Sequence, residues 1–182
     1  MGNSLGGYLA LQLAARGRAE SVVALAPAGG WAEDEESSSE TLANFRTMQR
    51  YLKAAAAHVD RIVATVDGRR RATSLITSNF EHIPSELLAH QMLGVANCEA
   101  MEPMIESALR DGWSLDAQRI GCPVRVIWGT GDRILSWPSA AARYRSDWLP
   151  HADWIELEGI GHCPQLDVPL ETAQLILGFT SP

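Results

Sequence analysis

The chain has 182 residues, of which 46% are hydrophobic and 20% are charged, which is the composition of an ordinary globular domain. Its 15 basic and 22 acidic residues give a formal net charge of −7, which disfavours proteins that bind nucleic acid or anionic membranes through a basic surface. No apolar run approaches the roughly 18 residues of a membrane span, and no signal peptide opens the chain. These features predict one domain and disfavour nucleic acid and membrane as partners.

The cysteine content predicts a reducing compartment. Cys98, Cys122 and Cys163 are odd in number, and no two of them are spaced as C-x-x-C. This pattern disfavours a disulfide framework and a structural zinc site. We therefore expect a cytoplasmic protein.

Both ends of the chain are predicted to alternate between strands and helices. Residues 4–17 have leucines at a spacing of four, which favours a helix, and 21–26 form a short apolar run typical of a buried parallel strand. The same patterns recur after residue 112. They predict strands at 124–129 and 154–158 and helices at 138–148 and 169–179.

The middle of the chain has a different character. The acidic stretch 33–39 is expected to be a solvated loop, because like charges repel and stay hydrated. Residues 40–112 are expected to be entirely helical, with helices at 85–95 and 98–111 among others. One helical face carries apolar side chains that are expected to form a core: Leu42, Phe45, Leu52, Val59, Ile62 and Val66. Strand–helix alternation interrupted by a helical insert indicates an α/β sheet with a helical cap.

The first catalytic signal is a nucleophile elbow at the start of the chain. Residues 2–6 fit G-x-S-x-G, a pattern that places a serine at a sharp strand-to-helix turn with its hydroxyl exposed. The flanking glycines are expected to let neighbouring backbone pass without a Cβ clash. A helix that opens at Ser4 directs its N–H groups toward a developing oxyanion, and the backbone N–H of Leu5 is the expected donor.

Two further candidates each follow a predicted strand. Asp132 closes Gly129-Thr130-Gly131-Asp132, and His162 closes Gly159-Ile160-Gly161-His162. A nucleophilic serine needs a base within hydrogen-bond reach, and the base needs a third group to hold its tautomer. Serine, aspartate and histidine in this chain order, each after a strand, predict a triad at the carboxyl edge of the sheet.

Other candidates are weaker. Trp31 and Trp137 follow strand ends and are expected either to line an apolar pocket or to pack in the core. Arg69-Arg70-Arg71 is expected to be a solvated helix end, with binding of an anionic substrate as the alternative. His151 precedes the last strand, at the wrong end for a base. The remaining histidines show no metal-ligand spacing and are expected to be structural or surface groups: His58, His82 and His90.

Through GNSLGG, PVRVIWGTGDRI and ELEGIGHCPQLDVP, essentially the whole chain resembles the capped α/β-hydrolase family. The resemblance implies the C-terminal portion of an α/β-hydrolase parallel sheet, formed by residues 1–30 and 113–182, with a helical cap at 31–112. It implies that Ser4 is the nucleophile, Asp132 the triad acid and His162 the general base of an acyl-enzyme mechanism without metal or organic cofactor.

The resemblance also narrows the reaction. A serine at the elbow argues against haloalkane dehalogenases and epoxide hydrolases, which place Asp there. Esterases, carbon–carbon bond hydrolases, haloperoxidase-like members, and some lyases and acyltransferases remain. We expect a small, partly apolar ester or related acyl substrate. The alternative is a truncated, non-catalytic remnant or a ligand-binding member that keeps the triad residues without turnover.

The chain departs from the family at its start. Family members carry several strands before the elbow and an earlier loop that donates a second oxyanion N–H, and this sequence opens at Met1, directly before the elbow. A misplaced start or a truncated gene is the simplest expectation. Residues 21–26 are then expected to form an unpaired apolar edge, which predicts low solubility or self-association, marginal stability and weak hydrolysis.

Overall fold

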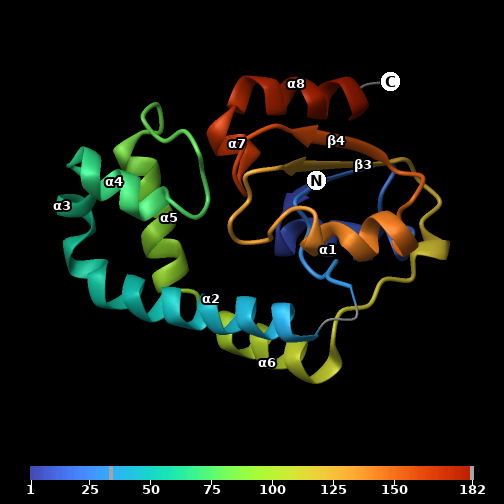
Figure 1. Cartoon of the computed structure of the whole chain (residues 1–182), viewed down its shortest axis with the longest axis horizontal. Coiled ribbons are helices and arrows are strands. Elements are labelled where there is room, and N and C mark those ends of the chain that lie inside the picture. Colours follow the sequence, from blue (N-terminus) through green and yellow to red (C-terminus); the bar gives the residue numbers. More distant parts are fainter. Residues whose placement is uncertain (33–34, 181–182) are drawn as a thin grey trace. The chain divides into compact units, whose positions relative to one another are not determined.

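A computed structural model of the chain describes residues 1–32 and 35–180 and contains a four-stranded, wholly parallel sheet (Figure 1). Its strands are β1 (Gly2–Asn3), β2 (Val22–Leu25), β3 (Val124–Gly129) and β4 (Asp153–Leu157), in the spatial order β1-β2-β3-β4. The three longer strands lie within a residue or so of the predicted ranges, because their apolar, partly β-branched runs are typical of strands buried on both faces. The predicted α/β fold class is confirmed.

The prediction that residues 21–26 form an unpaired edge is wrong. Strand β2 pairs with β3 along its full length, from Val22 opposite Val124 to Leu25 opposite Ile127. On its other side Ala24 and Leu25 pair with Gly2 and Asn3 of β1. The two residues before Ser4 extend far enough to form a short strand, so the edge of the sheet is β1 and not the apolar β2.

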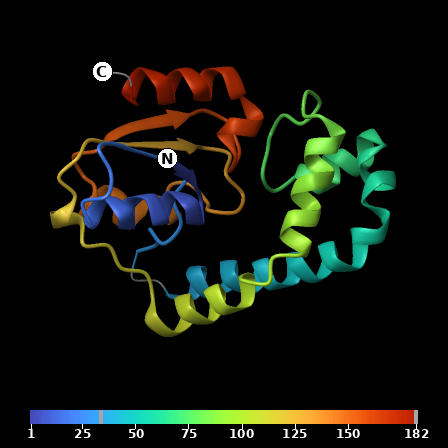
Figure 2. The ribbon, with the colours of Figure 1, turned by 180° about the vertical axis from the view of Figure 1, so that it is seen from behind.

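Helices cover both faces of this sheet (Figures 1 and 2). Helix α1 (Leu5–Ala15) and the segment 139–148 lie on one face, and α8 (Pro169–Thr180) lies on the other. Successive strand residues point to opposite faces and therefore divide between two cores. The α1 side is lined by Val22, Ala24, Val124, Val126 and Trp128 of the strands, and the α8 side by Val23, Leu25, Ile127 and Leu157.

The predicted helix at 138–148 has a different geometry. A 3₁₀ turn, η3 (Ser139–Ala141), is followed by a π-helical turn, η4 (Tyr144–Trp148). Tyr144 is fully buried, donates its hydroxyl to Ala28 O at 2.7 Å and lies edge-on to the Trp148 ring. These tertiary contacts determine the local geometry, which the apolar spacing alone does not contain.

The two candidate pocket tryptophans pack against other aromatic rings. Trp31 is buried in the α1-side core, with its ring 6.0 Å from that of Trp113. Trp137 lies between the rings of Trp128 and Trp154, at 5.9 and 6.4 Å. Of the two predicted roles, the structure therefore supports core packing.

The chain divides into two compact units. The sheet unit comprises Met1–Asp34, Leu75–Asn79 and Trp113–Pro182, and the helical unit comprises Glu35–Ser74 and Phe80–Gly112. The predicted boundaries of 31 and 112 differ from this division mainly at Leu75–Asn79, a segment that leaves the helical insert and packs with the sheet unit. That the insert acts as a cap stays a prediction.

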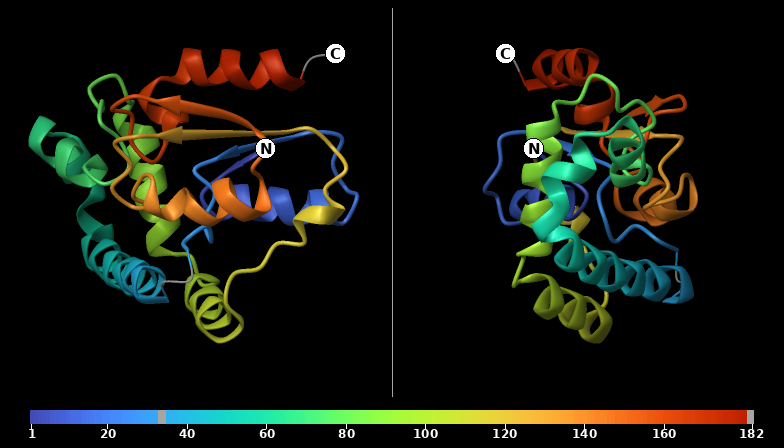
Figure 3. Two further views of the ribbon diagram at one scale, coloured as in Figure 1. Left: turned by 45° about the vertical axis from the view of Figure 1, so that its right-hand side comes forward. Right: turned by 90° about the vertical axis from the view of Figure 1, so that its left-hand side faces the viewer.

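Among the described residues of the insert, helices are the only regular elements, but residues 74–84 form an irregular connection, so the prediction of an entirely helical 40–112 is confirmed only in part (Figure 3). Helix α2 packs against α5 and α6, and α3 packs against α4 and α5. Along the predicted apolar face Leu42 and Val59 are buried, whereas Val66 is 61% exposed. The helices are α2 (Glu35–Ala55), η1 (Ala56–His58), α3 (Val59–Val63), α4 (Val66–Thr73), α5 (Ser85–Ala96) and α6 (Met101–Asp111).

The predicted acidic loop is only partly testable. Glu33 and Asp34 lie outside the described residues, and the prediction is wrong for residues 35–39, which form the first turns of α2. Acidic residues are favourable near a helix N-terminus, where unpaired N–H groups carry partial positive charge. Within the described ranges, no helix has the length and apolar character needed to cross a bilayer.

Candidate active site

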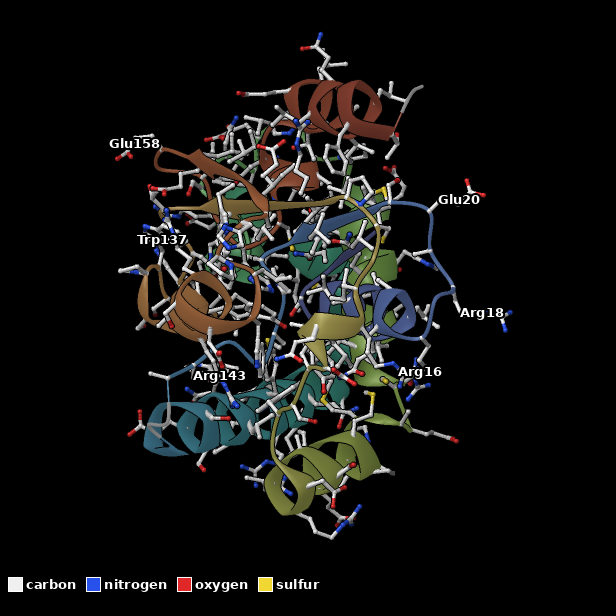
Figure 4. The ribbon with its side chains drawn as sticks, turned by 90° about the vertical axis from the view of Figure 1, so that its right-hand side faces the viewer. Arg16, Arg18, Glu20, Trp137, Arg143 and Glu158 are labelled. Atoms are coloured by element: carbon white, nitrogen blue, oxygen red, sulfur yellow. The ribbon has the colours of Figure 1, made fainter. Side chains whose placement is uncertain are left out.

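All three candidate catalytic residues lie beyond the carboxyl ends of strands. Ser4 directly follows β1, Asp132 follows β3, and His162 follows β4. The strands are parallel, so these ends meet at one edge of the sheet. The opposite edge carries Arg18 and Glu20, which project from the turn between α1 and β2 (Figure 4). His151 is exposed and precedes β4, and thus lies at that opposite edge, as expected.

Asp132 and His162 form a buried hydrogen-bonded pair. His162 Nδ1 lies 2.7 Å from Asp132 Oδ2, and the two residues are only 4% and 5% exposed. The second carboxylate oxygen, Oδ1, accepts the backbone N–H groups of Ile134 and Leu135, each at 2.8 Å. Both oxygens of Asp132 are therefore occupied, one holding its own loop and the other holding the imidazole. In a neutral ring this arrangement leaves Nε2 as the proton acceptor.

Ser4 has the strained backbone of a nucleophile elbow. Its φ of 56° and ψ of −123° lie where side chains other than glycine are rarely found, at a cost of about 1–3 kcal/mol. Backbone hydrogen bonds hold it there: its N–H donates to Leu25 O at 2.9 Å, and its carbonyl accepts from Tyr8 and Ala28, each at 3.1 Å. Strand β2 and helix α1 thus fix the serine from two directions.

The two glycines of the elbow are not equivalent. A Cβ on Gly2 would lie 2.2 Å from Gly6 O and 2.8 Å from Gly7 N, so the first turn of α1 passes directly over Gly2. A Cβ on Gly6 would meet no described atom within 4 Å. The steric requirement expected for both flanking glycines therefore applies here to Gly2 alone.

Asn3 joins the elbow to the histidine loop, a role that sequence reasoning missed. Its Nδ2 donates to His162 O at 3.0 Å and to Leu25 O at 3.1 Å. Its Oδ1 accepts from Cys163 Sγ at 3.3 Å and from Gln165 Nε2 at 3.2 Å. Among the described residues no hydrogen bond joins the Ser4 side chain to His162, so the link between nucleophile and base candidates runs through Asn3. The sequence feature that could have indicated this role is a hydrogen-bonding side chain, Asn3, at the second position of the G-x-S-x-G pattern, to which the pattern assigns no residue type.

The aspartate and histidine loops are packed backbone against backbone. A Cβ on Gly129 would lie 2.2 Å from Ile160 O, which only a glycine avoids without displacing the loop. Gly131 N donates to Ile160 O at 2.9 Å, and Gly159 N donates to Thr130 Oγ1 at 2.8 Å. The close approach explains the glycine at 129, ahead of Asp132, whereas Gly159, ahead of His162, has a φ of +69°, which favours glycine.

Two neighbouring groups complete the local chemistry. Leu5 is the first residue of α1, where backbone N–H groups have no partner within the helix, and it is the candidate oxyanion donor. Cys163, beside His162, is buried, and burial is the main cause that raises the pKa of its thiol to about 12. This thiol stays protonated at neutral pH and is a poor nucleophile, which leaves Ser4 as the nucleophile candidate.

The predicted arginine run belongs to the helical unit. Arg69, Arg70 and Arg71 lie in α4 of the helical unit, where Arg70 pairs with Asp67 at the exposed surface and Arg69 donates to Val63 O. The part of the chain that the structure describes contains no group of three or more His, Cys, Asp or Glu side chains that could hold a metal ion.

Comparison with known proteins supports the fold assignment. The model of the alpha/beta hydrolase fold family matches residues 1–169. Epoxide hydrolase EphH of Mycobacterium tuberculosis is 31% identical over 180 residues, which cover 98% of this chain and 84% of that protein.

Two solved structures share the fold at low sequence identity. A bacterial membrane phospholipase A aligns with a TM-score of 0.64 at 22% identity, over 98% of this chain and 55% of that one. The 2-hydroxy-6-oxo-6-phenylhexa-2,4-dienoate hydrolase of Rhodococcus sp. strain RHA1 aligns with a TM-score of 0.62 at 20% identity, over 97% and 61%. The chain therefore spans less than two thirds of the length of either structure.

Proposed function

The chain belongs to the α/β-hydrolase family, and from this premise we propose that it is a serine hydrolase of small, partly apolar esters or related acyl compounds. The observation that carries the proposal is the pairing of a strained Ser4 with a buried Asp132–His162 hydrogen bond at the same sheet edge. Backbone strain at a serine costs stability, and both this strain and a histidine held by a buried carboxylate are characteristic of catalytic sites.

The proposed reaction has two steps. Ser4 Oγ attacks the acyl carbon while His162 Nε2 takes its proton, and Leu5 N–H donates to the oxyanion of the tetrahedral intermediate. His162 then gives the proton to the leaving alcohol, and an acyl-enzyme remains. In the second step His162 takes a proton from water, which attacks the same carbon; the bond from that carbon to Ser4 Oγ then breaks, His162 returns the proton to Ser4 Oγ, and the acid is released. Asp132 holds the imidazole and stabilises its protonated form throughout, so the scheme requires no cofactor.

Epoxide hydrolysis is a second candidate, because the relative of 31% identity carries that name. The elbow residue argues against it on chemical grounds. Attack of a serine oxygen on an epoxide carbon would form an alkyl ether, which has no carbonyl for water to attack. A carboxylate nucleophile forms an ester that water can cleave, and this chain has Ser4 at the elbow. We therefore expect turnover of aryl esters and none of aryl epoxides.

Active-site labelling tests the proposal. A fluorophosphonate probe should label the wild-type chain and the Ser139→Ala variant equally, because Ser139 is an exposed serine in η3. Ser4→Ala should abolish labelling, together with hydrolysis of p-nitrophenyl esters. Equal labelling or ester turnover by Ser4→Ala would refute the nucleophile assignment. A wild-type chain that neither labels nor turns over would favour the non-catalytic or ligand-binding alternative.

A further inference from the structure

A second buried carboxylate lies near the candidate base. Asp167 closes the short helix α7 (Pro164–Asp167) and is only 1% exposed. Its Oδ1 accepts the N–H groups of Ser78 at 2.8 Å and Asn79 at 2.7 Å, and its Oδ2 accepts Gly161 N at 2.6 Å and shares Ser78 N at 3.0 Å. In the described residues no arginine or lysine pairs with Asp167. Backbone N–H groups therefore compensate for the burial of its carboxylate by donating hydrogen bonds to it.

These contacts hold the backbone on both sides of His162. Gly161, which Asp167 binds, directly precedes the histidine, and Cys163, which directly follows it, donates its N–H to Ile76 O at 2.9 Å. Both neighbours of His162 are therefore linked by hydrogen bonds to the 75–79 segment: Cys163 directly, and Gly161 through the Asp167 carboxylate. The approach is close: a Cβ on Gly161 would lie 2.9 Å from Thr77 Cα and 3.0 Å from Asp167 Oδ2.

We propose that Asp167 is a positioning residue, which fixes His162 against Asp132 by joining the histidine loop to the 75–79 segment of the helical insert. The inference rests on the proposed role of His162 as the base. Asp167 does not touch the reacting atoms. It acts through Gly161 and through the Ser78–Asn79 backbone, which orders the segment that also holds Cys163.

The acceptor chemistry of Asp167 makes the proposal testable. Within the described residues, every hydrogen bond to its carboxylate comes from a backbone N–H group, and an ionised carboxylate is acceptor-only. An asparagine has the same shape but one acceptor oxygen, so its NH₂ group would face at least one N–H and leave that donor unpaired. A buried donor without a partner is costly, and the loop should move to satisfy it.

The experiment compares Asp167→Asn with Thr172→Val. Thr172 is equally buried and lies in the neighbouring helix α8, and among the described residues it has no hydrogen bond to the histidine loop, so its variant controls for loss of a buried polar group. Asp167→Asn should lower kcat for p-nitrophenyl esters on the order of 10²-fold, with KM little changed, since a displacement of about 1 Å has that effect. The low-field proton resonance of His162 Nδ1 should weaken or disappear in Asp167→Asn and persist in Thr172→Val.

A third variant, Asp167→Glu, keeps two acceptor oxygens and should recover part of kcat and the resonance. The positioning role is wrong if Asp167→Asn melts earlier but retains wild-type kcat and an unchanged resonance well below its melting temperature. It is also wrong if both Asp167 variants fail to fold, because Asp167 is then simply a structural group. If the wild-type chain proves inactive, the proposed function fails by itself, and the resonance still shows whether Asp167 positions the His162 ring.

Discussion

Polar side chains have different tasks in the sheet unit and in the helical unit. In the sheet unit they join residues far apart in the sequence around one site: Asn3 contacts His162 across 159 positions, and Asp167 contacts Ser78 across 89. In the helical unit they join helices. For example, Gln49 of α2 donates hydrogen bonds to Val95 O in the last turn of α5 and to Cys98 O just after it. Substitutions in the first unit should therefore change chemistry, and those in the second should change specificity or stability.

The largest expected effect is at Asp132. Asp132→Asn should reduce kcat for p-nitrophenyl esters by about 10⁴-fold, because the amide favours the wrong tautomer of His162. Ser4→Ala and His162→Ala should remove essentially all nucleophilic turnover. Each variant should still melt cooperatively, as followed by circular dichroism. An Asp132→Asn enzyme with activity within tenfold of wild type would show that the buried pair is structural.

The helical unit should set substrate preference. Alanine at its exposed apolar side chains should, at one or more positions, shift the ratio of kcat/KM between short and long acyl esters by roughly 10–200-fold. The positions to test are Tyr51, Val66, Leu87, Met104 and Leu109. Leu177→Ala on α8, which is equally exposed but belongs to the sheet unit, should leave the ratio unchanged. Identical profiles across the set would contradict a cap role for this unit.

The β1 edge of the sheet unit is the proposed site of self-association. Met1, which precedes β1, is 67% exposed, and Leu9 and Leu13 of α1 are 51% and 49% exposed. We expect concentration-dependent oligomers in light scattering. Leu9→Lys combined with Leu13→Glu should raise their dissociation constant on the order of 10²-fold, since two leucine contacts are lost. As a matched control, Leu170→Lys combined with Leu177→Glu on α8 should leave this dissociation constant unchanged. A monodisperse wild-type monomer at all concentrations would rule the proposal out.

The smallest effects should come from polar contacts within the helical unit, and they should depend on burial. Gln49→Leu should lower the free energy of unfolding by about 1–3 kcal/mol, because the partly buried carbonyl groups of Val95 and Cys98 lose the donor that the buried Gln49 provides. Arg46→Ala, which removes the exposed pair with Glu102, should be barely measurable in urea denaturation.

Glu102, the partner of Arg46, determines how the effect of Arg46→Ala on the free energy of unfolding changes with pH. The hydrogen bond from Arg46 lowers the pKa of Glu102, so any stabilisation is present at neutral pH and is lost as pH falls through that lowered pKa. The difference between Arg46→Ala and wild type should thus vanish in acid. If Arg46→Ala lowered the free energy of unfolding more than Gln49→Leu, the claim that the effect of a polar contact depends on its burial would be wrong.

Much of the fold could be predicted because its strands are short, continuously apolar runs. Strand β3 coincides with the predicted 124–129, and the residues that follow each strand indicated which side chains share an edge. Segment 139–148 was predicted less well, since Tyr144 packs against the backbone at Gly30, where an added Cβ would lie 2.2 Å from its ring. No local pattern encodes that contact.

The same limit applies to the candidate site. Ser4, Asp132 and His162 belong to short motifs with recognisable glycines, so each could be proposed from its immediate neighbours. Asn3 and Asp167 lie within the same motifs, but most of the groups that they bind are distant in sequence, and many are backbone groups, such as His162 O for Asn3 and Ser78 N for Asp167. Backbone groups are identical at every position, so a sequence does not show which of them a side chain will bind.

The bond between Asn3 and His162 also bears on the order in which the molecule folds. Loop-closure entropy must be overcome before distant contacts contribute, so contacts of large sequence separation slow folding and form late. The two residues joined by the Asn3–His162 hydrogen bond are 159 positions apart, which is most of the 182-residue sequence. The elbow turn, built by β1, α1 and β2, needs only the first 28 residues. A partly folded chain would therefore form its serine turn well before the candidate base is in place, and the proposed hydrolysis would begin only when the last strand has joined the sheet.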